Sequence, residues 1–214
     1  MISKGVVSLR EVADNRRREK IPTGVVALDR LAGGLIRGGI CELVGEDGAG
    51  KRSLATSLAA SATNRGGLCG IVDGTDGFDP VSAQRCGVTL ERVLWVRCGG
   101  DISKAVLSAE HLVQSGLFEF IWLDLAGFSE HTLASLPSSY WYRFKSGLSG
   151  SATSMVVTLT SPRARSAAHQ SFRLSVNGLR WSDAFNFRMP EVLELHLECM
   201  RPVPASTDMA VAGI

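Results

Sequence analysis

A glycine-rich segment carries the residue types most suited to chemistry. Gly45, Gly48 and Gly50 precede Lys51, directly after an apolar run and directly before a helix expected over residues 53–63. Glycines let successive backbone N–H groups curve around phosphate oxygens, the helix N-terminus adds positive potential, and the lysine reaches the terminal phosphates. A strand, this loop and a helix in that order therefore predict a phosphate-binding loop, or P-loop. A tight glycine-rich turn without a ligand is the alternative.

The residue after the lysine departs from a working P-loop. Such a loop places Ser or Thr there so that the hydroxyl ligates magnesium, whereas this sequence has Arg52 and only then Ser53. A guanidinium cannot ligate a cation, so Arg52 either contacts a phosphate or points away. The apolar run over 120–123 ends at Asp124, which is the form of a Walker B strand, whose carboxylate acts through the same magnesium. We therefore expect a degenerate nucleotide site with weak binding of ATP or ADP and impaired binding of magnesium.

Composition limits the class of protein. The chain has 214 residues, of which 45% are hydrophobic and 21% charged, as is ordinary for one globular domain. Its 23 Lys and Arg against 21 Asp and Glu give a net charge of +2, so any nucleic-acid contact must be local. Without an apolar run of about 18 residues or an apolar N-terminal segment, we expect a cytoplasmic protein with no membrane contact. Five scattered cysteines and four scattered histidines predict reduced thiols and no metal site.

Strands and helices that alternate along the chain must position these residues. We expect strands over 40–44, 68–72, 93–97, 118–123 and 155–159, separated by helices over 53–63, 81–86, 102–115 and 138–149 and preceded by one over 26–31. This order predicts an α/β fold with a mainly parallel, twisted sheet flanked by helices. Antiparallel strands near the C-terminus are expected over 171–181 and 192–200. We divide the chain into an N-terminal helical arm at 1–20, a core domain at 21–201 and a flexible tail at 202–214.

The N-terminal arm has the pattern of a short amphipathic helix. A capping-box pattern over 8–11 starts it, and its apolar side consists of Leu9, Val12 and Ala13. These three residues are the candidates for self-assembly or partner binding, because an apolar face on so short a segment has to dock. The basic residues over 16–20 either touch a phosphate backbone or a partner, or form a solvated helix end.

Motifs spread over about residues 21–200 resemble the core of the RecA recombinase family in order and spacing. They are Ile21-Pro22-Thr23-Gly24, Leu28-Asp29, Gly33-Gly34-Leu35, the loop through Lys51, Val72-Asp73, Phe78-Asp79-Pro80, Gly87-Val88 and Ile121 to Asp124. Further segments resemble the ImuA-type relatives: Leu94 to Cys98, Tyr140 to Phe144, and Val156-Val157 followed by Pro162, Ala164 and Ser166. The resemblance implies an accessory role in translesion synthesis under the SOS response to DNA damage. Its implied partners are the Y-family polymerase-like protein of the mutasome, RecA and further copies of the chain.

The chemistry of the family carries over only where its residues are present. Its water-activating glutamate belongs two positions after Asp73, where Thr75 stands, and a threonine is no general base near neutral pH. Asp76 is adjacent, but one position along an extended segment turns its side chain to the opposite face. The glutamine that senses the nucleotide corresponds to Ser161. With the magnesium-ligating hydroxyl also missing, the resemblance implies that three parts of the hydrolytic apparatus are absent, and we assign no catalytic residue.

A short basic loop stands where the family has a long, glycine-rich second DNA-binding loop. Arg163 and Arg165 are the candidates for holding phosphates there, and two or three such contacts give weak, salt-dependent binding of single-stranded DNA. A solvated basic loop is the alternative. Tyr140, Trp141 and Tyr142 either stack on bases or, as is more common at helical spacing, belong to the core or an interface.

Three functions are compatible with these residues. We favour an adaptor in error-prone repair that binds nucleotide weakly or not at all and does not hydrolyse it. A DNA-stimulated ATPase of the recombinase type requires Ser53 and Asp76 to take over the missing roles. A relative of the cell-division inhibitors with RecA-like sequence has no discriminating motif here.

Overall fold

An eight-stranded sheet forms the centre of the protein, whose computed structural model describes residues 19–182, 189–202 and 209–213. The strand order is β10-β9-β8-β3-β7-β6-β4-β5. In chain order the strands are β3 Gly39–Val44, β4 Cys69–Asp73, β5 Val93–Arg97, β6 Phe120–Asp124, β7 Ser154–Leu159, β8 Gln170–Ser182, β9 Met189–Arg201 and β10 Met209–Gly213. All pairs from β8 to β5 are parallel, and β9 and β10 continue the sheet in antiparallel pairing. The α/β fold with antiparallel strands near the C-terminus is therefore confirmed.

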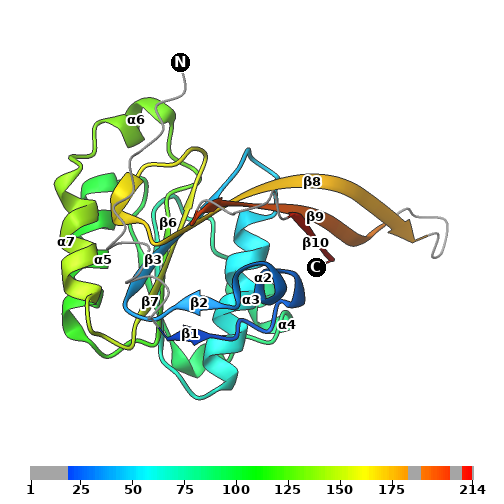
Figure 1. Ribbon diagram of the computed structural model, residues 1–214, viewed down its shortest axis with the longest axis horizontal. Coiled ribbons are helices and arrows are strands. Elements are labelled where there is room, and N and C mark those ends of the chain that lie inside the picture. The colour runs from blue at the N-terminus through cyan, green and yellow to red at the C-terminus, as the bar shows by residue number, and fades with distance from the viewer. Residues whose placement is uncertain (1–18, 183–188, 203–208, 214) are drawn as a thin grey trace.

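Helices cover both faces of the sheet (Figure 1). They are α2 Val26–Ala32, α3 Lys51–Asn64, α4 Pro80–Arg85, α5 Ile102–Ser115, α6 Glu130–Ala134 and α7 Ser139–Leu148. Two hydrophobic clusters result, one containing the apolar residues of α3 and the other those of α5 and α7. Strand β6 contributes to both, because successive side chains point to opposite faces: Trp122 belongs to the α3 side, and Ile121 and Leu123 to the α5 side. A separate antiparallel pair of short strands joins β1 Lys20–Ile21 and β2 Leu35–Ile36.

The ends of α5 show how local sequence sets the boundaries of a helix. The Asp101 carboxylate accepts hydrogen bonds from the backbone N–H groups of Ser103 and Lys104, each at 3.0 Å. Gly116 ends the helix in the left-handed region at φ 64°. The observed bounds agree with the predicted helix over 102–115. Helix α6 was not predicted, because its five residues are too few to show a helical period.

The hairpin of β8 and β9 extends beyond the rest of the sheet (Figure 1). Strand β8 pairs with β3 only over Gln170 to Arg173, so its later residues pair with β9 alone. Residues 209–213 pair with β9 as β10, where the sequence predicted a flexible tail from residue 202 onward. This pairing satisfies backbone groups that β9 would otherwise leave open at the sheet edge.

Some predictions fall on residues that the structure does not describe. The arm residues Leu9, Val12 and Ala13 lie outside the described residues. Across the described ranges, no helix is long and apolar enough to span a bilayer.

Candidate functional site

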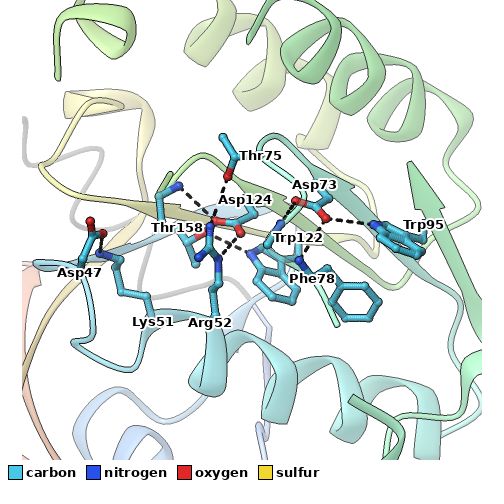
Figure 2. Close-up of polar contacts among 12 residues, drawn as sticks. Asp47, Lys51, Arg52, Asp73, Thr75, Phe78, Trp95, Trp122, Asp124 and Thr158 are labelled. Atoms are coloured by element: carbon cyan, nitrogen blue, oxygen red, sulfur yellow. Dashed lines mark hydrogen bonds and ion pairs between the residues drawn. The ribbon is translucent and has the colours of Figure 1, made fainter. Parts of the chain in front are cut away.

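Four loops meet at one edge of the sheet, where the parallel strands β3, β7, β6 and β4 have their carboxyl ends. Open α/β sheets bind ligands at this edge. Figure 2 shows side chains from β4, β6 and β7 and from the start of α3 directed toward one another. The P-loop and Asp124, which the sequence singled out separately, lie together there.

The P-loop backbone depends on glycine at three positions. Gly48 and Gly50 have φ of 79° and 80°, in the left-handed region that side chains disfavour. Gly45 packs against the hairpin, since a Cβ atom there would lie 2.4 Å from the carbonyl oxygen of Leu174. Gly50 caps α3, whose first N–H groups have no acceptor within the helix. These amides and the helix dipole suit the loop to an anion.

Lys51 is bound by the loop that it follows. Its side chain is buried, and its Nζ donates to the backbone carbonyls of Gly45 and of Glu46, the latter at 2.8 Å. The exposed carboxylate of Asp47 lies 3.9 Å from the same nitrogen. Burial lowers the pKa of Lys51 from its ordinary value, while Asp47 and then Asp124 oppose that shift. The ammonium is therefore held by backbone oxygens and must leave them to contact a phosphate.

Arg52 extends from α3 to the Walker B-type aspartate. Its Nε donates to Oδ2 of Asp124 at 2.5 Å, and its Nη2 donates weakly to Oγ1 of Thr75 at 3.4 Å (Figure 2). Gly77 lies against the guanidinium, because a Cβ on that glycine would come within 2.4 Å of Cζ. The sequence offered two alternatives for Arg52, a phosphate contact or a side chain that points away. The structure shows a third, an ion pair with Asp124.

The Asp124 carboxylate is fully buried and bound on both oxygens. Besides Arg52, it accepts from Oγ1 of Thr158 at 2.6 Å and from the backbone N–H of Ala126 at 3.1 Å. Thr158 in turn accepts from the indole N–H of Trp122 at 3.2 Å. These hydrogen bonds hold the Asp124 carboxylate in the orientation in which Oδ2 faces Arg52. Each oxygen of the Asp124 carboxylate therefore accepts from at least one protein donor.

The loop after β4 has a buried acid but no free carboxylate. Asp73 accepts from the backbone N–H groups of Gly77 and Phe78, at 2.9 and 3.0 Å, and from the indole of Trp95 at 3.2 Å. Asp76 is bound to Arg97 at 3.0 Å and has a left-handed φ of 57°. Asp76, the alternative candidate for a base, is thus paired with an arginine.

Two glutamates hold the loop after β7. Glu130, at the start of α6, accepts from the hydroxyls of Thr160 and Ser161 and forms an ion pair with Arg163. The hydrogen bond from Thr160, together with those from Ser161 and the charge of Arg163, lowers the pKa of Glu130. On the other side, the buried Glu42 of β3 accepts from the backbone N–H groups of Arg163 and Ala164 at 2.8 and 2.7 Å. Burial raises the pKa of Glu42, and these backbone bonds oppose the shift.

The candidate DNA-binding residues differ in accessibility. Arg163 is about one quarter exposed and bound to Glu130, whereas Arg165 is exposed and has a left-handed φ of 47°. Trp141 is buried and packs edge-on against Phe144 at 6.0 Å, as expected for a core residue. Tyr142 is half exposed, and its hydroxyl lies 2.8 Å from Oγ of Ser166. Arg165 is therefore the more accessible of the two arginines in this loop.

The site fits phosphate better than it fits magnesium. A metal requires oxygen ligands, yet Oδ2 of Asp124 is occupied by Arg52, and Ser53 is exposed one position, about 100°, further around the helix. The residues present therefore do not form a magnesium site. The P-loop amides do suit phosphate oxygens, and a cavity of about 630 Å³ adjoins the loop between residues 160–162 and 173–176.

Several residues of the site were not found by sequence reasoning. They are Glu42, Trp95, Trp122, Glu130 and Thr158. A signal existed for two of them, since Glu42 and Thr158 are polar residues within otherwise apolar buried strands. The others make contacts over 22 to 36 positions that no local pattern encodes.

A P-loop at the carboxyl edge of a mainly parallel sheet, with a buried aspartate two strands away, defines a P-loop α/β protein. Residues 2–129 match the model of the RecA N-terminal domain, and the chain belongs to the RecA family. It is similar to Protein RecA of Chloroflexus aurantiacus, with 36% identity over 121 residues, and of Roseiflexus sp., with 35% over 121. Protein RecA of Mesorhizobium japonicum shares 37% over 108 residues. These matches cover 56, 56 and 50% of this chain but only 34, 34 and 29% of the relatives, so the chain spans about a third of their length.

Proposed function

We propose that this RecA-family protein is an accessory adaptor in damage-induced, error-prone translesion synthesis, and that it binds nucleotide weakly without hydrolysing it. The observation that carries the proposal is the ion pair of Arg52 with Asp124, at 2.5 Å. A guanidinium is bound to the carboxylate through which a metal would have to act. A metal-dependent phosphoryl-transfer site cannot form while this pair is intact.

The loops after β4 and β7 support the same proposal. Thr75 stands where the family resemblance places a water-activating carboxylate, and its hydroxyl contacts Arg52 at 3.4 Å. Asp76 is bound to Arg97, so the alternative base is engaged in an ion pair. Ser161, at the position of the nucleotide-sensing glutamine, donates to Glu130 at 2.9 Å. An ATPase of the recombinase type would need each of these contacts to be rebuilt.

The proposed adaptor role requires surfaces that bind partner proteins and does not require hydrolysis of ATP. In the segments that resemble ImuA-type relatives, Leu94 on β5 and Tyr142 on α7 are each about half exposed. Each is a single exposed side chain, and we propose the two as contact points for a protein partner. The partners we propose are the Y-family polymerase-like protein of the mutasome, RecA and a second copy of the chain, with weak binding of single-stranded DNA through Arg165.

Phosphate release by the purified protein tests the lack of hydrolysis. We expect no release above background, with or without magnesium and single-stranded DNA, and no difference for Lys51→Ala. Hydrolysis that DNA stimulates and Lys51→Ala abolishes would contradict the proposal and favour the recombinase-type ATPase.

Association measurements test the adaptor role. We expect the chain to co-purify with the polymerase-like protein, and Val12→Glu in the arm to weaken that association or self-association. The control is Val81→Glu, which places the same charge on an exposed valine of α4. Unchanged mass in light scattering together with intact partner binding for Val12→Glu would exclude the arm as the assembly surface.

A further inference from the structure

Arg52 retains unused hydrogen-bonding capacity at the site. A guanidinium has five N–H donors, and the contacts found in the described part of the chain use the one on Nε and one on Nη2. The side chain is 41% exposed, whereas Asp124 is fully buried. The guanidinium therefore faces the buried acid on one side and solvent at the P-loop on the other.

The buried negative charge of Asp124 is balanced by one cation, the guanidinium of Arg52. A divalent ion at this carboxylate would have to displace the 2.5 Å contact or share the space with a fixed positive charge. Displacement is opposed by the contact with Thr75 and by Gly77, which packs on the guanidinium. A phosphate experiences the opposite effect, since guanidinium groups bind phosphate oxygens through paired N–H donors.

We propose that this P-loop binds nucleoside phosphates in their metal-free form, with Arg52 as a resident counter-ion in place of a divalent cation. This inference rests on the weak nucleotide binding of the proposed function. The phosphates would be bound by the amides at the start of α3, by Lys51 and by the free donors of Arg52. Glu46 and Asp47 are exposed acids on the same loop, so the ligand with fewer charges, a nucleoside diphosphate, is favoured over a triphosphate.

Titration of the full-length protein with a fluorescent ADP derivative tests the inference. The affinity is measured in excess EDTA and again in excess magnesium, for the wild type and for Arg52→Thr. We expect the wild type to bind ADP no more tightly with magnesium than with EDTA, because magnesium withdraws the metal-free nucleotide, and Arg52→Thr to bind at least about tenfold more tightly with magnesium than with EDTA.

A matched control and a second variant guard against indirect effects. Arg65→Thr removes the same charge at the other end of α3, where Arg65 pairs with Glu119 at 2.9 Å, and should leave the metal response unchanged. Should Arg52→Thr fail to fold, Arg52→Lys keeps the charge and is expected to bind ADP in EDTA. Manganese, detected by its electron paramagnetic resonance signal with ADP present, should bind to Arg52→Thr and not to the wild type.

Each outcome of the titration decides the inference. Wild-type binding that requires magnesium overturns it, and so does the absence of binding in both buffers, although that result leaves the adaptor function intact. Binding of manganese to the wild type at this site also overturns it. Metal-free binding together with measurable hydrolysis would refute the proposed function while leaving the role of Arg52 standing.

Discussion

The ion pair of Arg52 with Asp124 predicts an asymmetric response to removal of either partner. Arg52→Leu leaves a fully buried carboxylate with hydrogen bonds from Thr158 and Ala126 but no counter-charge. Loss of one partner from a buried pair costs about 3–5 kcal/mol, and because Arg52 is 41% exposed we expect roughly 2–3 kcal/mol. Asp124→Asn leaves an arginine that can turn to water, so the loss of one charge-assisted bond should cost about 1.5 kcal/mol.

The double variant separates the pair energy from other effects. The variant that combines Arg52→Leu with Asp124→Asn leaves no unpaired buried charge. It also leaves no asparagine N–H group facing an arginine N–H group. We expect it to be about 2 kcal/mol more stable than the sum of the single effects predicts. The free energy of unfolding is obtained from urea titration followed by tryptophan fluorescence, in EDTA so that no metal contributes. Trp122, which donates to Thr158 within the same chain of bonds, makes the site visible to this probe.

A surface pair at the same end of the sheet provides the control. Arg97 and Asp76 are 3.0 Å apart, and both are more than a third exposed. Their double-mutant cycle should give a coupling free energy well below that of Arg52 and Asp124. If the Arg52 and Asp124 effects are simply additive, or if Asp124→Asn costs more than Arg52→Leu, then the guanidinium is not the counter-charge of the buried acid.

Three further predictions concern the residues around the site. Trp95→Phe removes the indole donor to Asp73 and should lower the free energy of unfolding by about 1.5–3 kcal/mol in urea titration; an unchanged midpoint would contradict that contact. Burial raises the pKa of Glu42 above its ordinary value, so the stability it contributes is present below pH 4.5 and is lost as the pH rises through the raised folded pKa. As the pH rises through the folded pKa of Glu42, the free energy of unfolding of Glu42→Gln should therefore increase relative to that of the wild type. A difference between the two proteins that stays constant with pH would refute this. Glu130→Gln should free Arg163, so that the salt dependence of single-stranded DNA binding steepens by about 0.7 in log–log slope; an unchanged slope would mean that Arg163 stays bound.

The fold was largely predictable because its signals are local. The helix over 102–115 matches α5 at both ends, since an aspartate cap and a glycine stop are encoded within a few residues of the helix. Strand β10 was not predictable from its own residues, because it exists through pairing with β9, and the composition of that segment indicates a tail. For the same reason, the sequence does not show that β5 is a half-exposed edge strand, because position in a sheet is not a local property.

The site was predictable as a set of positions but not as a set of contacts. Lys51, Arg52 and Asp124 were identified by motif, and the structure places them together. What Arg52 does was not predictable, because its partner lies 72 positions away and both alternatives considered were local to the loop. Likewise, the sequence gives Arg163 no visible partner, and Glu130 binds it only because α6 begins beside the loop after β7.

The strand order has a consequence for how the chain folds during synthesis. Strand β3 ends at residue 44, yet its neighbours in the sheet are β7 and β8, which begin at residues 154 and 170. At a synthesis rate of about 5–20 residues per second, the nascent apolar strand waits roughly 5–20 seconds for its first partner. The P-loop that follows it cannot be fixed in position before then. A ribosome that stalls between β3 and β7 would hold an open, aggregation-prone strand, so the level of active protein should depend on translation speed and chaperones over these 110 codons.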